Sequence, residues 1–413
     1  MKRIISVFLI IISLSTTTIM SVINYNAEIV GETTIGDKAS IDYSKYFNPD
    51  ALLEREDFDT DEEYGAYIDE FNKNSSPCET IASVSENTIT VKANKVYELT
   101  GIKPKRMIQN FHVGVSYIYA TSCQPSEEGT YDMYILRFKI GSDGKTATYQ
   151  DKMTFENFGH NQILTPYTYN NKTYLWIGCK PNTSENDFWG LTTQFGRVQY
   201  EANKTYTHYN QICRFGNLNY ANKSGSNLGI VIRNDGALSS NKEYFMLSVR
   251  CRKYESDGET YTDTIAYSCY DNVALNKALD KVEADTNTNL VVFKDNTTLK
   301  NACLYTIKDK PENLPNGKSC QGIELSNAFS LYISGGAGTG NNNGPAIKKF
   351  IKNGDSYVST GTTVNVTDGT HAWAETELEG LQIYSDYLYF VLHKQDADRS
   401  TQCIYSIEKS KLN

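Results

Sequence analysis

Short apolar strands recur along most of this chain in units that begin roughly 50 to 60 residues apart. Each unit has a polar or glycine-led start, an apolar strand, a polar turn and a second strand rich in Tyr and Ile. The anchors of the units are Phe111, His160, Cys213, Asp271, Gln321 and Glu379. About four strands fit into one unit, which is the size of a β-propeller blade. The repeat predicts an all-β fold, a propeller of about five blades of four-stranded antiparallel sheets. A pair of β-sandwiches is the alternative.

Two further features of the propeller can be predicted. We expect the last strand of the chain to close a blade that begins near the N-terminal end of the repeats. One segment, residues 271–285, departs from the strand pattern because its apolar residues lie close to helical spacing. These residues are Val273, Leu275, Ala278, Leu279 and Val282. The segment therefore predicts a short helix inserted between strands.

Residues 1–27 have the pattern of a secretory signal peptide. Lys2 and Arg3 are followed by the apolar run IISVFLIIISL and then by small polar residues. An Ala-x-Ala cleavage site is missing, so an uncleaved membrane anchor is the alternative. Past this segment no stretch is long and apolar enough to span a bilayer. We therefore expect a secreted protein with no stable membrane span after signal cleavage.

Residues 28–75 form a polar, acidic lead-in to the expected propeller domain, residues 76–413. Between Asp50 and Glu70 there are ten acidic residues and one arginine, a local net charge of 1 − 10 = −9. The whole chain of 413 residues also has a net charge of −9, so the rest is close to neutral and offers no basic surface for nucleic acid. DTDEEYGAYIDEF fits a short helix with Thr60 as N-cap and Glu63 at the capping-box position.

The nine cysteines are scattered and form no CxxC pair. Export favours disulfides among some of them, but apolar strand positions explain others equally well. The odd number leaves at least one thiol free or bonded to another chain. The five histidines likewise lack the close spacing of a metal site. No metal and no cofactor is therefore expected.

Polar residues at the starts of predicted innermost strands form one candidate site. The innermost strand of each blade lines the central channel of a propeller, so Gln321, Glu324, Glu379 and Gln382 are expected to face or rim it. Paired carboxylates there can perform acid–base chemistry on a glycosidic bond, or bind a cation or sugar hydroxyls. They can equally hold blades together, which is the favoured interpretation because buried polar groups usually serve packing.

A second candidate site lies in the central stretch from His160 to Tyr200. His160 and Gln162 begin one predicted strand, and Trp189, Gln194 and Arg197 lie on the strand that returns beside it. If the five converge at one mouth of the channel, they would suit an acidic or acetylated sugar. The competing interpretation is that Arg197 and Gln194 tie adjacent strands together while Trp189 packs between blades.

Four motifs of this chain occur in one order. The first joins Gly-His-x-Gln from Gly159, Trp-Ile-Gly-x-Lys-Pro from Trp176, and Gln-x-Gly-Arg-Val from Gln194. The others are RFGNLNYANKSGSN, CQGIELSNAFSLYISGG and ETELEGLQIYSDYLYFVLHK. In these motifs the chain resembles the helveticin J family of large, heat-labile class III bacteriocins, with residues 155–410 covered. It departs from the family's pattern in GIVIRNDGALSSNKEYFM, where a histidine is expected.

The resemblance implies a secreted antibacterial protein that acts at the envelope of related bacteria, and it assigns no catalytic residue. The expected partner is a component of the bacterial cell envelope, such as a cell-wall glycan. Two alternatives stay open: a non-lethal glycan-binding module or adhesin, and a propeller glycosidase or lyase. A binding role is favoured over an enzymatic one.

Overall fold

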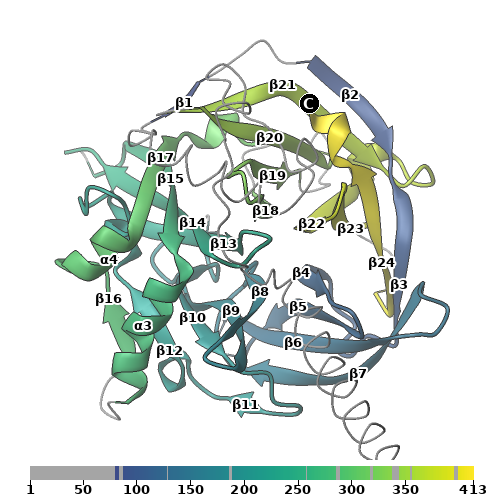
Figure 1. The fold of residues 1–413 in the computed structure, drawn as a ribbon, viewed down its shortest axis with the longest axis horizontal. Coiled ribbons are helices and arrows are strands. Elements are labelled where there is room, and N and C mark those ends of the chain that lie inside the picture. Colours follow the sequence, from purple (N-terminus) through teal and green to yellow (C-terminus); the bar gives the residue numbers. More distant parts are fainter. Residues whose placement is uncertain are drawn as a thin grey trace, which may run out of the picture.

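The structure is a computed structural model that describes residues 80–413 apart from 83–86, 128, 186–187, 257, 285–288, 317–319, 337–343, 354–355 and 395–398. The predicted signal peptide, residues 1–27, and the acidic lead-in, residues 28–75, lie outside the described residues. The described chain is mostly β, and its strands form five blades around a common centre (Figure 1). The propeller prediction is confirmed, and this arrangement excludes the β-sandwich pair.

Each blade is a four-stranded antiparallel sheet, numbered here by the order of its innermost strand. Blade one consists of β4 (Ile108–Val113), β5 (Tyr117–Pro125), β6 (Tyr131–Ile140) and β7 (Thr146–Phe155). Blade two consists of β8 (Leu164–Tyr169), β9 (Lys172–Pro181), β10 (Thr192–Val198) and β12 (Cys213–Gly216). Blade three consists of β13 (Ile230–Leu238), β14 (Tyr244–Tyr254), β15 (Tyr261–Asp271) and β17 (Cys303–Asp309). Blade four consists of β18 (Gly322–Leu325), β19 (Leu331–Gly335), β20 (Ala346–Asn353) and β21 (Ser356–Thr367). Blade five consists of β22 (Thr376–Tyr384), β23 (Tyr387–Lys394), β24 (Thr401–Glu408) and β3 (Asn94–Thr100).

Blade five joins the two ends of the described chain. β3 pairs antiparallel with β24, from Thr100 opposite Thr401 to Asn94 opposite Ser406. The predicted sharing of one blade between the last strand and the N-terminal part is therefore confirmed, although the C-terminal strands begin this blade and β3 is its outermost strand. The ring also closes at its centre, because β4, β8, β13, β18 and β22 contact one another in that order and β22 contacts β4 again.

Short elements link the outer edges of the blades. β1 (Thr80–Ala82) lies between β17 and β21 and is parallel to both, and β2 (Asn87–Lys92) is parallel to β21. β11 (Thr205–Tyr206) pairs with β7, and β16 (Leu290–Val292) pairs with β12. The 3-10 helices that the described residues include are η4 (Tyr209–Gln211), η5 (Leu218–Tyr220), η6 (Pro311–Asn313), η7 (Trp373–Glu375) and η8 (Lys409–Leu412).

The helix predicted over residues 271–285 is confirmed as α3 (Asn272–Glu283). The Asp271 carboxylate accepts a hydrogen bond of 2.7 Å from the Ala274 N–H and so caps the first turn. Leu275 and Leu279, four residues apart, lie on one face and are fully buried. A second short helix, α4 (Thr297–Ala302), follows β16 and leads into β17.

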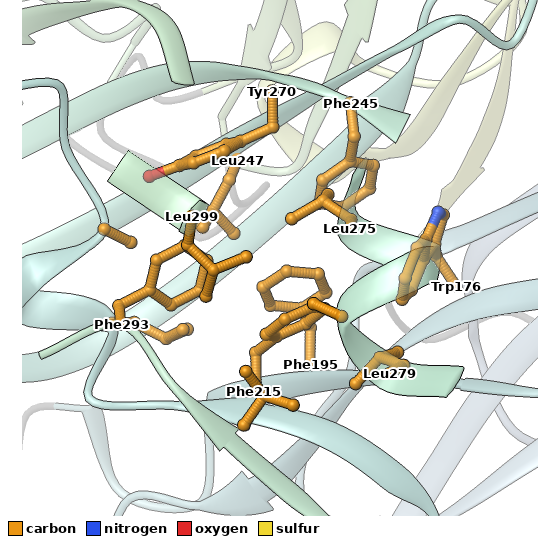
Figure 2. Close-up of a cluster of buried hydrophobic side chains, with 14 of the residues drawn as sticks. Trp176, Phe195, Phe215, Phe245, Leu247, Tyr270, Leu275, Leu279, Phe293 and Leu299 are labelled. Atoms are coloured by element: carbon orange, nitrogen blue, oxygen red, sulfur yellow. The ribbon is translucent and has the colours of Figure 1, made fainter. Parts of the chain in front are cut away.

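The core lies between the blades, because both faces of each sheet are covered by neighbours. Alternate residues of β14 face opposite sides: Phe245 and Leu247 join an aromatic cluster with blade two, and Met246 joins another with blade four. Figure 2 shows the first cluster, in which Trp176, Phe195, Phe215 and Phe245 pack together beside α3. The indole N–H of Trp176 donates to the Asn272 side chain at 3.0 Å, so its one polar atom is satisfied inside the core.

Two predicted blade anchors are wrong. Cys213 begins β12, the outermost strand of blade two, and Asp271 is the N-cap of α3. The innermost strand between them in the chain, β13, carries Arg233, Asn234 and Asp235 in its middle. These polar residues interrupt the apolar pattern on which the prediction of blade starts depended.

The expectation of disulfides is not met in the described part of the chain. Its eight cysteines are all free thiols, and Cys78 lies outside the described residues. Five of the eight, at positions 179, 251, 269, 303 and 320, are buried within or beside strands, as the alternative interpretation had it. No helix among the described residues has both the length and the apolar character needed to cross a membrane.

Candidate functional site

The innermost strands run in one direction around the channel, so they all begin at the same face of the propeller. We call this the top face and the other the bottom face. Connections from an outermost strand to the next blade lie on the top face, as do those between the second and third strands. Gln162 lies two residues before β8 and Gln321 directly before β18, so both lie at the top end of the channel.

A polar cluster to which every blade contributes fills this end of the channel. Its members share hydrogen bonds across blade boundaries and are almost completely buried: Asn110, Gln162, Arg233, Asp235, Gln321, Glu377 and Glu379. Three of the residues predicted to reach the channel, Gln162, Gln321 and Glu379, thus contact one another directly.

Arg233 is the cation of the cluster. Its guanidinium makes a two-pronged contact with Asp235, with Nε and Nη2 donating at 2.8 and 2.9 Å. Nη2 also donates to the Gln162 side-chain oxygen and to the Cys320 carbonyl, so Arg233 links blades two, three and four. A fork of fixed donors suits such a bridge better than a lysine would.

Blade five contributes two carboxylates to the cluster, Glu377 and Glu379. The cation of the cluster, Arg233, already pairs with Asp235. Glu379 accepts from the Gln162 amide at 2.9 Å, and Glu377 accepts from the Gln321 amide at 2.6 Å. Burial and then the neighbouring Glu377 carboxylate raise the pKa of Glu379 well above its usual range. This shift favours the neutral form of Glu379, which relieves the excess of buried negative charge.

Deeper in the channel, the buried Glu324 carboxyl lies near the half-buried Lys242 side chain. Burial raises the pKa of Glu324, and the Lys242 ammonium lowers it in part. They line a cavity of about 10 Å³ together with residues of all five innermost strands, among them Asn110, Thr165 and Gln382. That volume is close to the minimum for one water molecule, so a sugar ring does not fit at this level of the channel.

Gln382 lies on this cavity but has a structural partner. Its side-chain oxygen accepts from the Val113 N–H at 2.7 Å, and its amide donates to the Val113 carbonyl at 3.1 Å. The side chain thus continues the β ladder from β22 to β4 and joins the last blade to the first.

The other predicted residues do not converge at the channel mouth. Arg197 points outward to α3, where its Nη2 lies 2.5 Å from both Asp280 and Glu283. Gln194 accepts from the Arg214 side chain of the neighbouring strand at 3.0 Å. His160 packs edge-on against the Tyr131 ring at 5.4 Å, and its Nδ1 is buried with no hydrogen-bond partner among the described residues.

Of the predicted site residues, Trp189 is the one whose side chain is exposed to solvent. It lies in the connection between β9 and β10 on the top face, and 41% of its surface is exposed. Its indole N–H donates to the Gly129 carbonyl of blade one at 2.6 Å. The ring is therefore held across two blades and still presents itself to the solvent.

Further aromatic and apolar side chains of blades two and three lie on the same face, and together with Trp189 they form what we call the aromatic surface. Its members are Phe188, Trp189, Ile230, Tyr254 and Tyr261. Ile230 and Tyr261 are each 44% exposed. The Arg252 guanidinium carbon lies 3.7 Å from the Tyr261 ring centre and 5.5 Å from that of Phe188, so one cation joins two rings.

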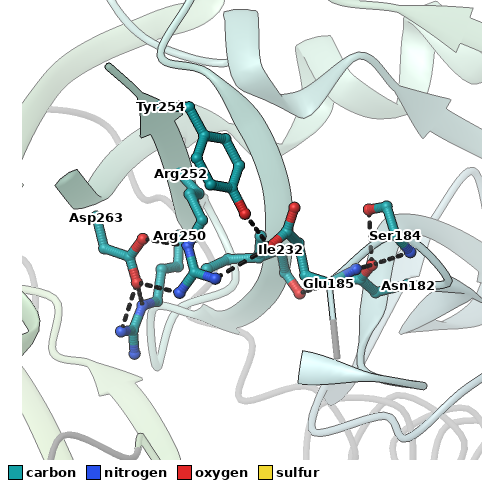
Figure 3. Close-up of polar contacts among 8 residues, drawn as sticks. All are labelled: Asn182, Ser184, Glu185, Ile232, Arg250, Arg252, Tyr254 and Asp263. Atoms are coloured by element: carbon teal, nitrogen blue, oxygen red, sulfur yellow. Dashed lines mark hydrogen bonds and ion pairs between the residues drawn. The ribbon is translucent and has the colours of Figure 1, made fainter. Parts of the chain in front are cut away.

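Ion pairs hold the aromatic surface from below (Figure 3). Asp263 accepts from Arg250 at 2.7 Å and from Arg252 at 2.8 Å, and these hydrogen bonds lower its pKa although burial opposes the shift. Glu185 accepts from Arg252 at 3.0 Å and from the Tyr254 hydroxyl at 2.7 Å. These contacts fix the side chains of Arg252 and Tyr254.

Sequence reasoning missed the members of both sites that come from blade three. Arg233 and Asp235 lie two residues apart in a strand with apolar residues at both ends, and Arg250 and Arg252 repeat that spacing on β14. Charges at alternate positions of a buried strand indicate a fixed ion pair or a site, and this signal was available. Among the described residues, no group of three His, Cys, Asp or Glu side chains is arranged to hold a metal ion.

Fold and site together define a five-bladed β-propeller with a closed polar centre and an aromatic surface on its top face. Residues 87–410 match the profile of the family described as bacteriocin helveticin-J. The chain belongs to this family, as its motifs indicated. No curated protein matches the chain.

Several solved structures are similar to the chain at low identity. One is the tail fiber of Staphylococcus aureus phage P68, with 13% identity, a TM-score of 0.45, and 76% of this chain and 52% of the fiber covered. Another is the RS223 β-xylosidase, with 8% identity, a TM-score of 0.36, and 75% and 94% covered. A third is an α-L-arabinofuranosidase from Fusarium graminearum, with 9% identity, a TM-score of 0.34, and 77% and 78% covered. The chain spans about half the length of the tail fiber, and scores this low carry no argument about function.

Proposed function

We propose that this protein is exported and inhibits related bacteria by binding a component of their envelope through the top face. Membership of the bacteriocin helveticin-J family supports antibacterial action. The signal-peptide pattern of residues 1–27 supports export. The single observation that carries the site is Trp189, whose ring is exposed to 41% although its N–H is bonded to Gly129.

The chemistry of the aromatic surface suits a glycan of the cell wall. Sugar rings present apolar C–H faces that stack on Trp and Tyr, while their hydroxyls stay in water. Because the cavity at the centre is too small for a sugar ring, such binding would take place at the surface of the propeller. Because the contacts below the aromatic surface fix the side chains of Arg252 and Tyr254, little of their side-chain entropy is lost on binding.

Binding to isolated cell walls of related Gram-positive bacteria tests the site. We expect Trp189→Ala and Tyr261→Ala each to weaken binding about tenfold, the effect of losing a stacking contact of about 1.4 kcal/mol. Tyr387→Ala is the matched control, because Tyr387 is 40% exposed but lies at the bottom face in the turn between β22 and β23. Equal binding by all three variants, with unchanged melting temperatures, would refute this placement of the site.

Growth inhibition separates the proposed bacteriocin from a non-lethal adhesin. The purified chain is expected to inhibit some strains of a panel of related bacteria, and Trp189→Ala is expected to inhibit them less. Saturable wall binding without inhibition of any strain would instead make the protein a binding module. A glycosidase or lyase is the less favoured alternative, since Glu324 and Glu379 are buried and the cavity that Glu324 lines has room for about one water molecule.

A further inference from the structure

An open groove lies on the outer rim of the propeller, far from the top-face site. It has a volume of about 280 Å³ and runs between α3, β16 and α4, which lie side by side at the edge of blades two and three (Figure 1). Its lining is mostly apolar and includes Ala278, Val282, Leu290 and Val292. Val292 is 37% exposed, so the groove presents apolar surface to the solvent.

Lysines lie in and beside this groove: Lys281 lines it, and three others are on the segments that border it, together with the exposed Asp295. Lys277 and Lys281 follow one another on the outer side of α3, and Lys294 and Lys300 lie before and within α4. All four are exposed, and none forms an ion pair with a described residue. The two acidic residues of α3, Asp280 and Glu283, are bound to Arg197. A partner with apolar anchors and negative charge would therefore complement the groove.

We propose that the acidic N-terminal segment of this same chain, residues 58–71, docks in the groove as an amphipathic helix. Tyr64, Tyr67, Ile68 and Phe71 have the spacing i, i+3, i+4 and i+7, which places them on one face of a helix. The other face carries the acidic residues, which belong to the stretch of ten acids and one arginine between Asp50 and Glu70. Apolar anchors fill the groove, and the carboxylates meet the lysines in and beside it.

The point at which the chain enters the described structure favours this occupant. β1 runs parallel to β17, with Thr80 opposite Lys308, so the residues before Thr80 approach from the side where β17 begins. β17 begins at Cys303, directly after α4. The nine residues from Phe71 to Thr80 span up to about 30 Å when extended. The seven residues of β17 span about 23 Å, so the groove is within reach.

Hydrogen exchange on the full chain tests the proposal. Backbone amides of residues 60–71 are expected to exchange at least tenfold more slowly in the wild type than in Lys281→Glu, whose substitution lies in the groove. Lys253→Glu is the matched control, since it makes the same charge change at an exposed lysine of β14. In the segment itself, Ile68→Asp is expected to abolish the protection, and Ala66→Asp, on the opposite helix face, to retain it.

Equal exchange of residues 60–71 in the wild type and in both lysine variants would overturn the proposal. So would protection of residues 278–298 that persists in Ile68→Asp and rises with protein concentration, because a second copy would then cover the groove. Melting temperatures within a few degrees of the wild type establish that each variant is folded.

Discussion

At the scale of single residues, Arg197 shows how a predicted ligand-binding cation serves packing instead. Its guanidinium carbon lies 4.6 Å from the centre of the Tyr174 ring, and its nitrogens bond to Asn276, Asp280 and Glu283 of α3. Arg197 is 3% exposed, whereas its carboxylate partners are 40% and 49% exposed in their side chains. The residue therefore fastens α3 to blade two.

Arg197→Met should lower the free energy of unfolding by about 2–3 kcal/mol, because the ties to α3 are lost while the exposed carboxylates regain water. Wall binding should not change. Urea unfolding measures the first quantity, with Arg106→Met, at an exposed arginine, as the control. A loss of wall binding without a loss of stability would instead support a role of Arg197 in binding.

His160 is predicted to make stability depend on pH. Burial and then the charge of Arg233 lower the pKa of His160 to about 4, against 6.5 for the unfolded chain. The folded state therefore binds fewer protons between these values, and its stability falls as the pH drops from 6.5 towards 4. His160→Phe keeps a ring against Tyr131 and removes the titration. Melting temperatures from pH 7 to pH 4 should therefore fall more steeply for the wild type, and parallel curves would contradict the prediction.

At the scale of elements, Gly380 allows three innermost strands to meet. Its φ is +63°, and a Cβ there would lie 2.8 Å from the Asn110 side-chain oxygen on β4. A Cβ on Gly322 of β18 would lie 2.9 Å from the Gly380 carbonyl carbon. The backbones of β18, β22 and β4 thus approach one another more closely than side chains allow.

Gly380→Ala should destabilise the fold by about 2–4 kcal/mol, since it adds both backbone strain and a clash. Gly144→Ala is the matched control, because Gly144 has the same φ of +63° but no atom within 4 Å of the place that a Cβ would take. That control should cost about 1 kcal/mol. Equal losses in chemical denaturation would mean that the close approach of the strands contributes nothing.

At the scale of the whole molecule, closure by β3 is expected to decide whether the ring is stable. A chain that starts at residue 101 lacks β3 and exposes the edges of β24 and β7. Its melting temperature should fall by more than about 10 °C, or the cooperative transition should vanish. A chain that starts at residue 93 keeps β3 and is the control. Similar melting of both shortened chains would show that the other four blades suffice.

The sequence predicts the propeller and part of its centre for one physical reason. Blades repeat, and the residues that start innermost strands must reach the channel, so Gln321 and Glu379 could be placed before their contacts were known. Arg233 could not, because its charge makes β13 look unlike an innermost strand and its partner Gln162 lies 71 residues away.

The functional surface was harder to predict than the fold. Trp189 stands out in the sequence, but its exposure depends on a hydrogen bond to Gly129 in another blade, 60 residues away. The same holds for Arg197, whose partners lie on α3, 79 to 86 residues further along. Sequence spacing reports which face of an element a residue occupies, whereas the neighbour that covers the face depends on topology.

The pairing of β3 with β24 also determines when the ring can close during synthesis. β3 is among the first strands to be synthesised, and its partner follows about 300 residues later, so blade five cannot form until almost the whole chain has been made. Before β24 has been synthesised, β3 has no antiparallel partner. The ring therefore stays open while the strands of the other four blades are synthesised.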